Sequence, residues 1–86
     1  MSKKQMLISC FENAMECDMG YVALMLKLEN DHIELIVIPN ESLNYKLKYY
    51  EDKYNDELQL KSFNEIEIIN FTCCDTLEQI ELDFFY

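Results

Sequence analysis

Arginine and tryptophan are missing from this 86-residue chain, and glycine, proline and histidine each occur once. Without arginine the chain has no bidentate clamp for an anionic ligand. With Gly20 as its only glycine, it can form neither a GxGxxG dinucleotide loop nor a Walker phosphate loop. The one histidine, His32, falls in a predicted loop and has no evident orienting partner. We therefore expect no catalytic residues and no cofactor.

Metal-binding patterns are also absent. The segment 52–57 superficially resembles a calcium loop, but it lacks the central glycine and places Tyr54 at the third ligand position. A zinc site at Cys73 and Cys74 would need two more ligands, and the chain has no CxxC motif and no histidine pair. We expect no metal. We interpret all four cysteines, including Cys10 and Cys17, as reduced and as small apolar residues in or near the core.

Long hydrophobic runs are missing as well. Lys3 and Lys4 precede an apolar pattern that Glu12 and Glu16 interrupt, so we expect no signal peptide. No run approaches the ~20 apolar residues of a membrane span. These features predict a cytoplasmic protein without membrane contact. Half of the residues are apolar, which is enough for one core at this length, and we expect a single compact domain over 1–86.

Negative charge is the strongest feature of the sequence. Seventeen Asp and Glu residues stand against seven lysines, which gives a net charge of -10 and a pI near 4.3. Such an excess repels nucleic acids and anionic membranes and attracts basic surfaces. The expected partner is a basic protein, and direct binding to nucleic acid is not expected. The alternative is that the charge only keeps the protein soluble.

Helical spacing and capping residues predict a first helix over about 3–18. Ser2 and Gln5 form a capping box, Leu7 and Phe11 lie on its apolar stripe, and Gly20 is placed as a left-handed C-terminal cap. A second helix is expected over about 41–54, with Asn40 as its N-cap after Pro39. Its apolar stripe is Leu43, Leu47, Tyr50 and Tyr54.

Two apolar runs, 21–28 and 33–38, predict an antiparallel hairpin closed by the four residues 29–32. Strand alternation then places two sets of side chains on opposite faces. One face would carry Val22, Leu24, Leu26, Leu28, Ile33, Leu35 and Val37. The other would carry Tyr21, Ala23, Met25, Ile36 and Ile38, which is too apolar to leave in water. We expect the C-terminal helix or a second copy of the chain to cover it.

The remainder of the chain predicts a loop over 58–63, an isoleucine-rich strand over 65–72 and a last helix. Asp75 and Glu78 form the capping box of that helix, and Leu77, Ile80 and Phe84 point inward. The fold class is α+β in the order α-β-β-α-β-α, with a three-stranded sheet and packed helices. The connection through the second helix allows either a parallel crossover or an antiparallel meander.

A contact surface is predicted from the second helix and the acidic segments. Tyr45 and Tyr49 lie opposite the apolar stripe, and tyrosine buries a large area at low entropic cost. The candidate partner-binding residues are Tyr45, Tyr49, Asp52, Asp56, Glu57, Glu78, Glu81 and Asp83. Carboxylates arranged along one side of a small domain can imitate the charge of DNA.

A resemblance to known proteins rests on three segments. These are 44–50, 54–58 and 66–72, which read NYKLKYY, YNDEL and IEIINFT. The second half of the chain resembles small acidic proteins encoded by phages and mobile elements of low-GC Gram-positive bacteria. The resemblance implies an anti-defence role, such as that of anti-CRISPR proteins, which occupy the DNA-binding channels of Cas nucleases. No functional residue is transferred, because the shared pattern contains no catalytic signature.

Two functions follow as expectations. The first is a phage-encoded inhibitor that engages a basic surface of a nucleic-acid-binding defence protein of the host, with imitation of DNA as one way of doing so. The second is a homodimeric structural or regulatory module that uses the apolar sheet face as its interface. A small enzyme or nucleotide-sequestering protein is a third class, for which the sequence offers no machinery. Salt separates the first two, because it weakens binding by carboxylates and does not weaken an apolar interface.

Overall fold

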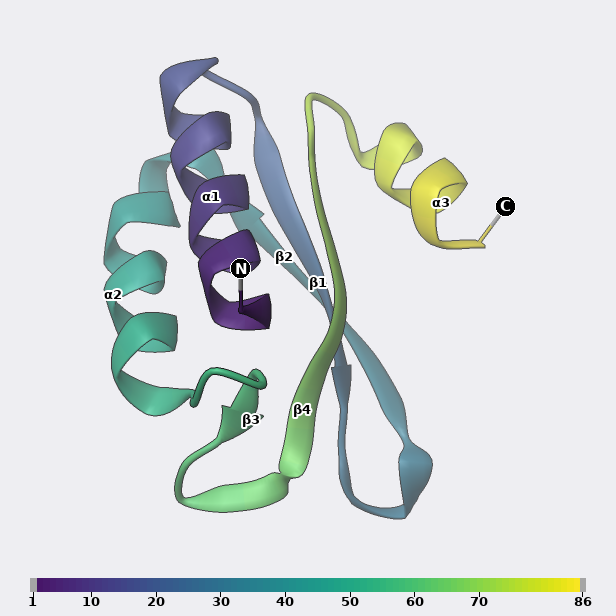
Figure 1. Cartoon of the computed structure of the whole chain (residues 1–86). Coiled ribbons are helices and arrows are strands. Elements are labelled where there is room, and N and C mark those ends of the chain that lie inside the picture. Colours follow the sequence, from purple (N-terminus) through teal and green to yellow (C-terminus); the bar gives the residue numbers. More distant parts are fainter. Residues whose placement is uncertain (1, 86) are drawn as a thin grey trace.

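The computed structural model describes residues 2–85, apart from the side chains of Asp83 and Phe85. Figure 1 shows a sheet that carries helices on both of its faces. The helices are α1 (Lys3–Glu16), α2 (Leu43–Lys53) and α3 (Leu77–Phe85). The strands are β1 (Tyr21–Lys27), β2 (Ile33–Pro39), β3 (Gln59–Leu60) and β4 (Phe63–Cys74). Single 3-10 turns, η1 (Glu29–Asp31) and η2 (Asn40–Ser42), precede β2 and α2.

The sheet is antiparallel with the strand order β2-β1-β4-β3. The α+β class is confirmed, but the expected three-stranded sheet is wrong. The segment 58–63, expected as a loop, contributes β3, which pairs with β4. Because β2 and β4 both run antiparallel to β1, they are parallel to each other on its two sides. The chain passes from β2 to β4 through α2 and β3, and β1 lies between β2 and β4 in the sheet.

The main core lies between the sheet and the helix pair α1 and α2 (Figure 1). The expected core residues Leu7, Phe11, Leu43, Leu47 and Tyr50 are all buried there. They pack against Val22, Leu24, Leu26, Ile38, Tyr54, Leu58 and Ile68. The 3.6-residue spacing in the two helices therefore identified the correct faces.

α1 begins as predicted and ends differently. The Ser2 hydroxyl oxygen accepts a hydrogen bond from the Gln5 backbone N–H at 3.2 Å, which confirms the N-cap. The helix ends at Glu16, and the left-handed residue after it is Asp18, with φ 53°, instead of Gly20. Gly20 has another role, because a Cβ at this position would lie 2.8 Å from the Asp75 carbonyl oxygen. The glycine permits close approach of two backbones at the start of β1.

The hairpin is present, but the predicted face of β2 is wrong. Lys27 pairs with Ile33, so five residues, 28–32, connect the strands in place of the four predicted. One additional loop residue shifts the pairing by one and exchanges the two faces of β2. Ile36 and Ile38 therefore join the core side, while Ile33, Leu35 and Val37 lie on the side of α3. Leu28 belongs to the loop, in which Asn30 and Asp31 adopt positive φ.

The caps of the later helices are each displaced from their predicted residues. Asn40 does not cap α2, because its side-chain amide donates to the Met19 carbonyl at 2.7 Å, and α2 starts at Leu43. For α3, the Thr76 hydroxyl accepts from the Gln79 N–H at 3.2 Å, and the Gln79 side chain accepts from the Asp75 N–H at 3.3 Å. The capping box is therefore one residue later than the predicted pair Asp75 and Glu78.

α3 covers part of the second sheet face. Ile80 is buried against Ala23 and Cys74, and Phe84 packs beside them. Leu77 was predicted to point inward, but it is 58% exposed. A single short helix is too narrow to cover the face of four strands, so the side chains of β2 on this side remain in contact with solvent.

Replacing Leu47 with alanine should lower the free energy of unfolding by about 2–5 kcal/mol, because a buried leucine is lost and a cavity remains. Chemical denaturation monitored by circular dichroism measures the change. Tyr45→Ala, at a 75% exposed position on the same helix, is the matched control and should change stability by less than about 0.5 kcal/mol. Equal effects of the two substitutions would contradict the orientation of α2.

Candidate protein-binding surface

The two predicted tyrosines lie on the outer face of α2. Tyr45 is 75% exposed and Tyr49 is 44% exposed. The Lys46 Nζ lies between the two rings, 6.0 Å from the Tyr45 centroid and 5.7 Å from that of Tyr49. Tyr49 also makes an edge contact with Tyr50 at 5.2 Å between centroids, so its ring is fixed against the core. Only Tyr45 presents most of its ring to a partner.

Asp56 and Glu57 lie on a well-defined turn after α2. The Asn55 Oδ1 accepts from the backbone N–H groups of Glu57 at 2.9 Å and Gln59 at 3.0 Å, which closes an Asx turn. Leu58 follows with φ 62°, an unfavourable conformation for leucine, and its side chain is fully buried. Burial of that side chain holds the turn in place. Both carboxylates, and Asp52 before them, are exposed.

The acidic residues of α3 lie on the other side of the sheet from this turn (Figure 1). Glu78 and Glu81 are exposed on α3. The Asp83 side chain lies outside the described side chains. Because α2 and α3 cover opposite faces, the structure divides the predicted site residues into two groups. Tyr45, Tyr49, Asp52, Asp56 and Glu57 form one group, and Glu78 and Glu81 form the other.

The charge is divided unequally between two parts of the chain. The helical layer, residues 1–20 and 40–62, contains eight carboxylates and six lysines, a net charge of -2. The hairpin, β4 and α3, residues 21–39 and 63–86, contain nine carboxylates and one lysine, a net charge of -8. We call this second part the acidic half. The candidate residues of α2 lie among lysines, whereas Glu78 and Glu81 lie in the acidic half.

Few of these carboxylates are neutralised by neighbours. Among the side chains that the structure describes, the ion pairs are Lys3–Glu57 at 3.9 Å and Lys27–Asp31 at 3.5 Å, both on the surface. Lys27 is the lone lysine of the acidic half. It borders a hollow at the hairpin tip whose wall also includes four carboxylates. These are Glu29, Asp31, Glu65 and Glu67.

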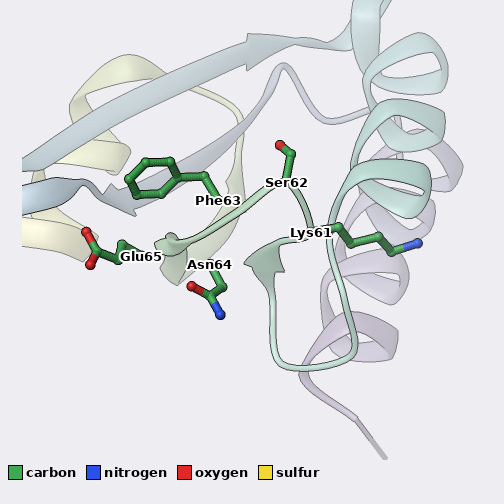
Figure 2. Close-up of a pocket in the computed structure, with 5 residues that line it drawn as sticks. All are labelled: Lys61, Ser62, Phe63, Asn64 and Glu65. Carbon is green, nitrogen blue, oxygen red and sulfur yellow. The ribbon is translucent and has the colours of Figure 1, made fainter.

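A hollow at the turn between β3 and β4 does not have the geometry of a binding site. Its walls are five consecutive residues, Lys61 to Glu65. Figure 2 shows their side chains pointing in different directions, with the Lys61 amine and the Phe63 ring on opposite sides. No polar groups converge there, and convergence is what a small-molecule site requires.

A second depression combines apolar walls with an acidic rim. This groove has a volume of about 320 Å³ and lies between β2 and α3. Leu35 and Val37 form one wall, Leu77 and Ile80 form the other, and Glu81 borders it. Sequence reasoning missed the groove because it placed Leu35 and Val37 on the core side. The length of the hairpin loop decides which face of β2 lies on the core side, and sequence alternation alone does not give that length.

The cysteines are not all core residues. Cys74 is buried, Cys10 and Cys73 are half-buried, and Cys17 is exposed after the end of α1, which contradicts its expected place in or near the core. Burial, followed by the nearby Cys73 and Cys74, raises the pKa of Cys10 to about 12. Asn13 connects two of the thiols, because it donates to the Cys73 sulfur at 3.8 Å and accepts from the Cys17 thiol at 3.6 Å.

No protein-family model, curated protein or solved structure matches the chain. Among residues 2–85 no group of three or more metal-ligating side chains comes together. Over the same residues, no helix has the length and apolar character needed to cross a membrane. The function of the protein must therefore be inferred from its own surface.

Alkylation of the native protein at pH 8 should label Cys17 first and leave Cys10 unmodified. At that pH only about one Cys10 in ten thousand is the reactive thiolate, given its pKa of about 12. Peptide mapping by mass spectrometry after limited iodoacetamide treatment identifies the modified residue. Cys17→Ser should abolish the rapid labelling, whereas rapid labelling of Cys10 in the folded protein would contradict its environment.

Proposed function

We propose that the protein is a non-enzymatic inhibitor that binds a basic surface of a nucleic-acid-binding protein and keeps nucleic acid away from it. The observation that carries the proposal is the concentration of net charge -8 in the hairpin, β4 and α3. In keeping with the resemblance to phage-encoded acidic proteins, the partner is a defence protein of the host, with a Cas nuclease as the leading candidate.

The distribution of the charge supports a role beyond solubility. Solubility alone is served by charged residues of both signs interspersed over the whole surface. Here six of the seven lysines lie in the helical layer, and the 25 residues after Lys61 contain six carboxylates and no lysine. Such one-sided charge increases the rate of encounter with a basic surface and orients the acidic half toward it.

The acidic half is also the better candidate for imitating nucleic acid. A basic channel built for phosphates repels lysines, and Lys46, Lys48, Lys53 and Lys61 all lie on or next to α2. The surface with Glu78 and Glu81 has no such opposing charges in its own segment. We therefore assign first contact with the partner to α3 and the hairpin, and a secondary role to Tyr45 and Tyr49.

The test compares two sets of neutralised carboxylates. In the first variant, Asp75→Asn, Glu78→Gln and Glu81→Gln are combined on the acidic half. In the matched control, Asp52→Asn, Asp56→Asn and Glu57→Gln remove the same charge from the helical layer. Immobilised protein captures partners from a host lysate, and each captured nucleic-acid-binding protein is then assayed for release of a labelled duplex.

The wild-type protein should displace the duplex from the partner. Displacement should become less effective as salt rises from low to physiological concentration, because salt screens the charges. The first variant should need at least about tenfold more protein for the same displacement, mainly through slower association. The control should need less than about threefold more. If both sets leave displacement unchanged, or if the partner retains its duplex with this protein bound beside it, the proposal is wrong.

One observation favours the alternative function, a homodimeric module. Ile33, Leu35 and Val37 are partly exposed on β2, and Leu77 and Leu82 are exposed on α3. Joining two copies through these residues, however, brings two acidic halves together, which like-charge repulsion opposes. The expected sheet-face interface is also reduced, because α3 already covers Ala23 and Cys74.

Light scattering at micromolar concentration should therefore give the mass of a monomer at physiological salt. Raising the salt to molar concentration screens the repulsion and tests whether charge is what keeps the copies apart. A dimer at physiological salt would favour the alternative function over the inhibitor.

A further inference from the structure

The outer edge of β2 is open. The strand order places β2 at one edge of the sheet, and within residues 2–85 it pairs only with β1. The opposite edge is formed by β3, which has only two residues. β2 has seven residues and forms the whole of one edge of the described sheet, whereas the opposite edge is shared by β3 and the part of β4 that extends beyond it. Free strand edges are places where another chain can add a strand.

The hydrogen-bond pattern shows which backbone groups of β2 face outward. At one end of the hairpin the Asn40 N–H donates to the Gly20 carbonyl, and at the other the Leu28 N–H donates to the His32 carbonyl. The intervening register has no shift, so successive residue pairs alternate between bonded and non-bonded, and every second pair from Gly20–Asn40 to Leu28–His32 is bonded. The N–H and C=O groups of Ile33, Leu35 and Val37 therefore point away from β1.

The same three residues expose their side chains on the face that carries α3. Ile33, Leu35 and Val37 are each between 36% and 41% exposed. Leu35 and Val37 form a wall of the apolar groove, opposite Leu77 and Ile80. Leu35 and Val37 thus combine outward-facing backbone groups with side chains that line the apolar groove. This is the combination by which a sheet edge recognises an extended peptide, with affinity from the backbone and specificity from alternate side chains.

The charges beside this edge define the occupant. Glu81 borders the groove, and Glu34 is exposed on β2 between Ile33 and Leu35. The single lysine of the acidic half, Lys27, is already paired with Asp31 at 3.5 Å. A strand added beside β2 would therefore lie among carboxylates. Lysine or arginine is favoured in that strand, and a second copy of this acidic chain is disfavoured.

We propose that β2 accepts an extended segment of the basic partner as a fifth, antiparallel strand. In this segment apolar residues alternate with lysine or arginine. The apolar side chains lie over Leu35 and Val37 and enter the groove against Leu77, while the basic side chains lie on the opposite face, near Glu34. The inference rests on the proposed function and names the part of the partner that is recognised.

The geometry makes a strict prediction about backbone amides. In an antiparallel pair, a residue whose side chain lies over Leu35 or Val37 also directs its own N–H toward β2. The apolar residues of the segment would thus donate the hydrogen bonds, and the N–H groups of its basic residues would face solvent. Methylating one set of amides should abolish binding, and methylating the other should not.

The experiment uses a short fluorescent peptide in which lysine and valine alternate, with fluorescence anisotropy at physiological salt as the readout. A peptide of the same composition, with its lysines and valines in separate blocks, is the composition control. Two further versions carry N-methyl groups on the valine amides or on the lysine amides. The alternating peptide should bind at least about tenfold more tightly than the block peptide.

Methylation of the valine amides should abolish that advantage, and methylation of the lysine amides should preserve it. On the protein, Leu77→Ser removes a wall of the groove without touching the strand edge and should weaken binding about tenfold. Leu82→Ser, at an equally exposed leucine of α3 outside the groove, is the matched control and should have little effect. Val37→Pro, which removes an outward N–H, should also weaken binding and is used if its circular dichroism spectrum is native.

Four results would overturn the proposal. Equal affinity for the alternating and block peptides would mean that charge alone drives binding, which leaves the proposed inhibitor function intact. Failure of both peptides to bind would show that the edge of β2 is not a peptide-binding site. The duplex-release assay would then test the proposed inhibitor function separately. Loss of binding only on methylation of the lysine amides would indicate a parallel strand. A dimer that Val37→Pro dissociates would make the occupant a second copy.

Discussion

The register of the β1–β2 hairpin is the constraint on which the rest of the structure depends. β1 is one of the two inner strands, with Val22 and Leu24 buried on one face and Ala23 buried on the other. The five-residue connection to β2 fixes which β2 side chains share each face. A connection one residue shorter would place Ile33, Leu35 and Val37 in the core and remove the apolar groove. Core, groove and free edge are therefore consequences of one pairing.

Much of the fold follows from local patterns in the sequence. The Ser2 cap and the helical spacing of Leu7 and Phe11 were sufficient to orient α1, and the stripe that contains Leu47 oriented α2. These predictions succeeded because helix faces are set by residues three and four positions apart. The two-residue β3 was missed, because its pairing depends on β4 and on the Asn55 turn instead of on its own composition.

The errors have a common physical origin. Gly20 was assigned to a helix cap because of its conformational freedom, but it is required for the approach of Asp75 from 55 residues later in the chain. Asn40 was assigned as a cap because of its local preference, but its amide bonds to Met19 across the end of the sheet. In both cases a long-range contact determined the role. The division of the candidate site residues into two groups was missed for the same reason. It arises because the sheet places α2 and α3 on its opposite faces, which local sequence patterns do not reveal.

The distribution of charge connects this architecture to function. The sequence predicts a strongly acidic protein, but the separation into a nearly balanced helical layer and an acidic half appears only when the sheet places α3 opposite α1 and α2. The free edge of β2 lies in that acidic half. An extended basic segment would there find carboxylates, apolar walls and open backbone groups together, and each would reinforce the others.

Amide hydrogen exchange of β2, measured by nuclear magnetic resonance, tests this account most directly. In the free protein the N–H groups of Ile33, Leu35 and Val37 should exchange rapidly, whereas those of Glu34, Ile36 and Ile38, bonded to β1, should be protected. Addition of the alternating lysine–valine peptide should then protect the first set. Protection of Ile33, Leu35 and Val37 in the free monomer, with rapid exchange at Ile36 and Ile38, would contradict both the register and the open edge.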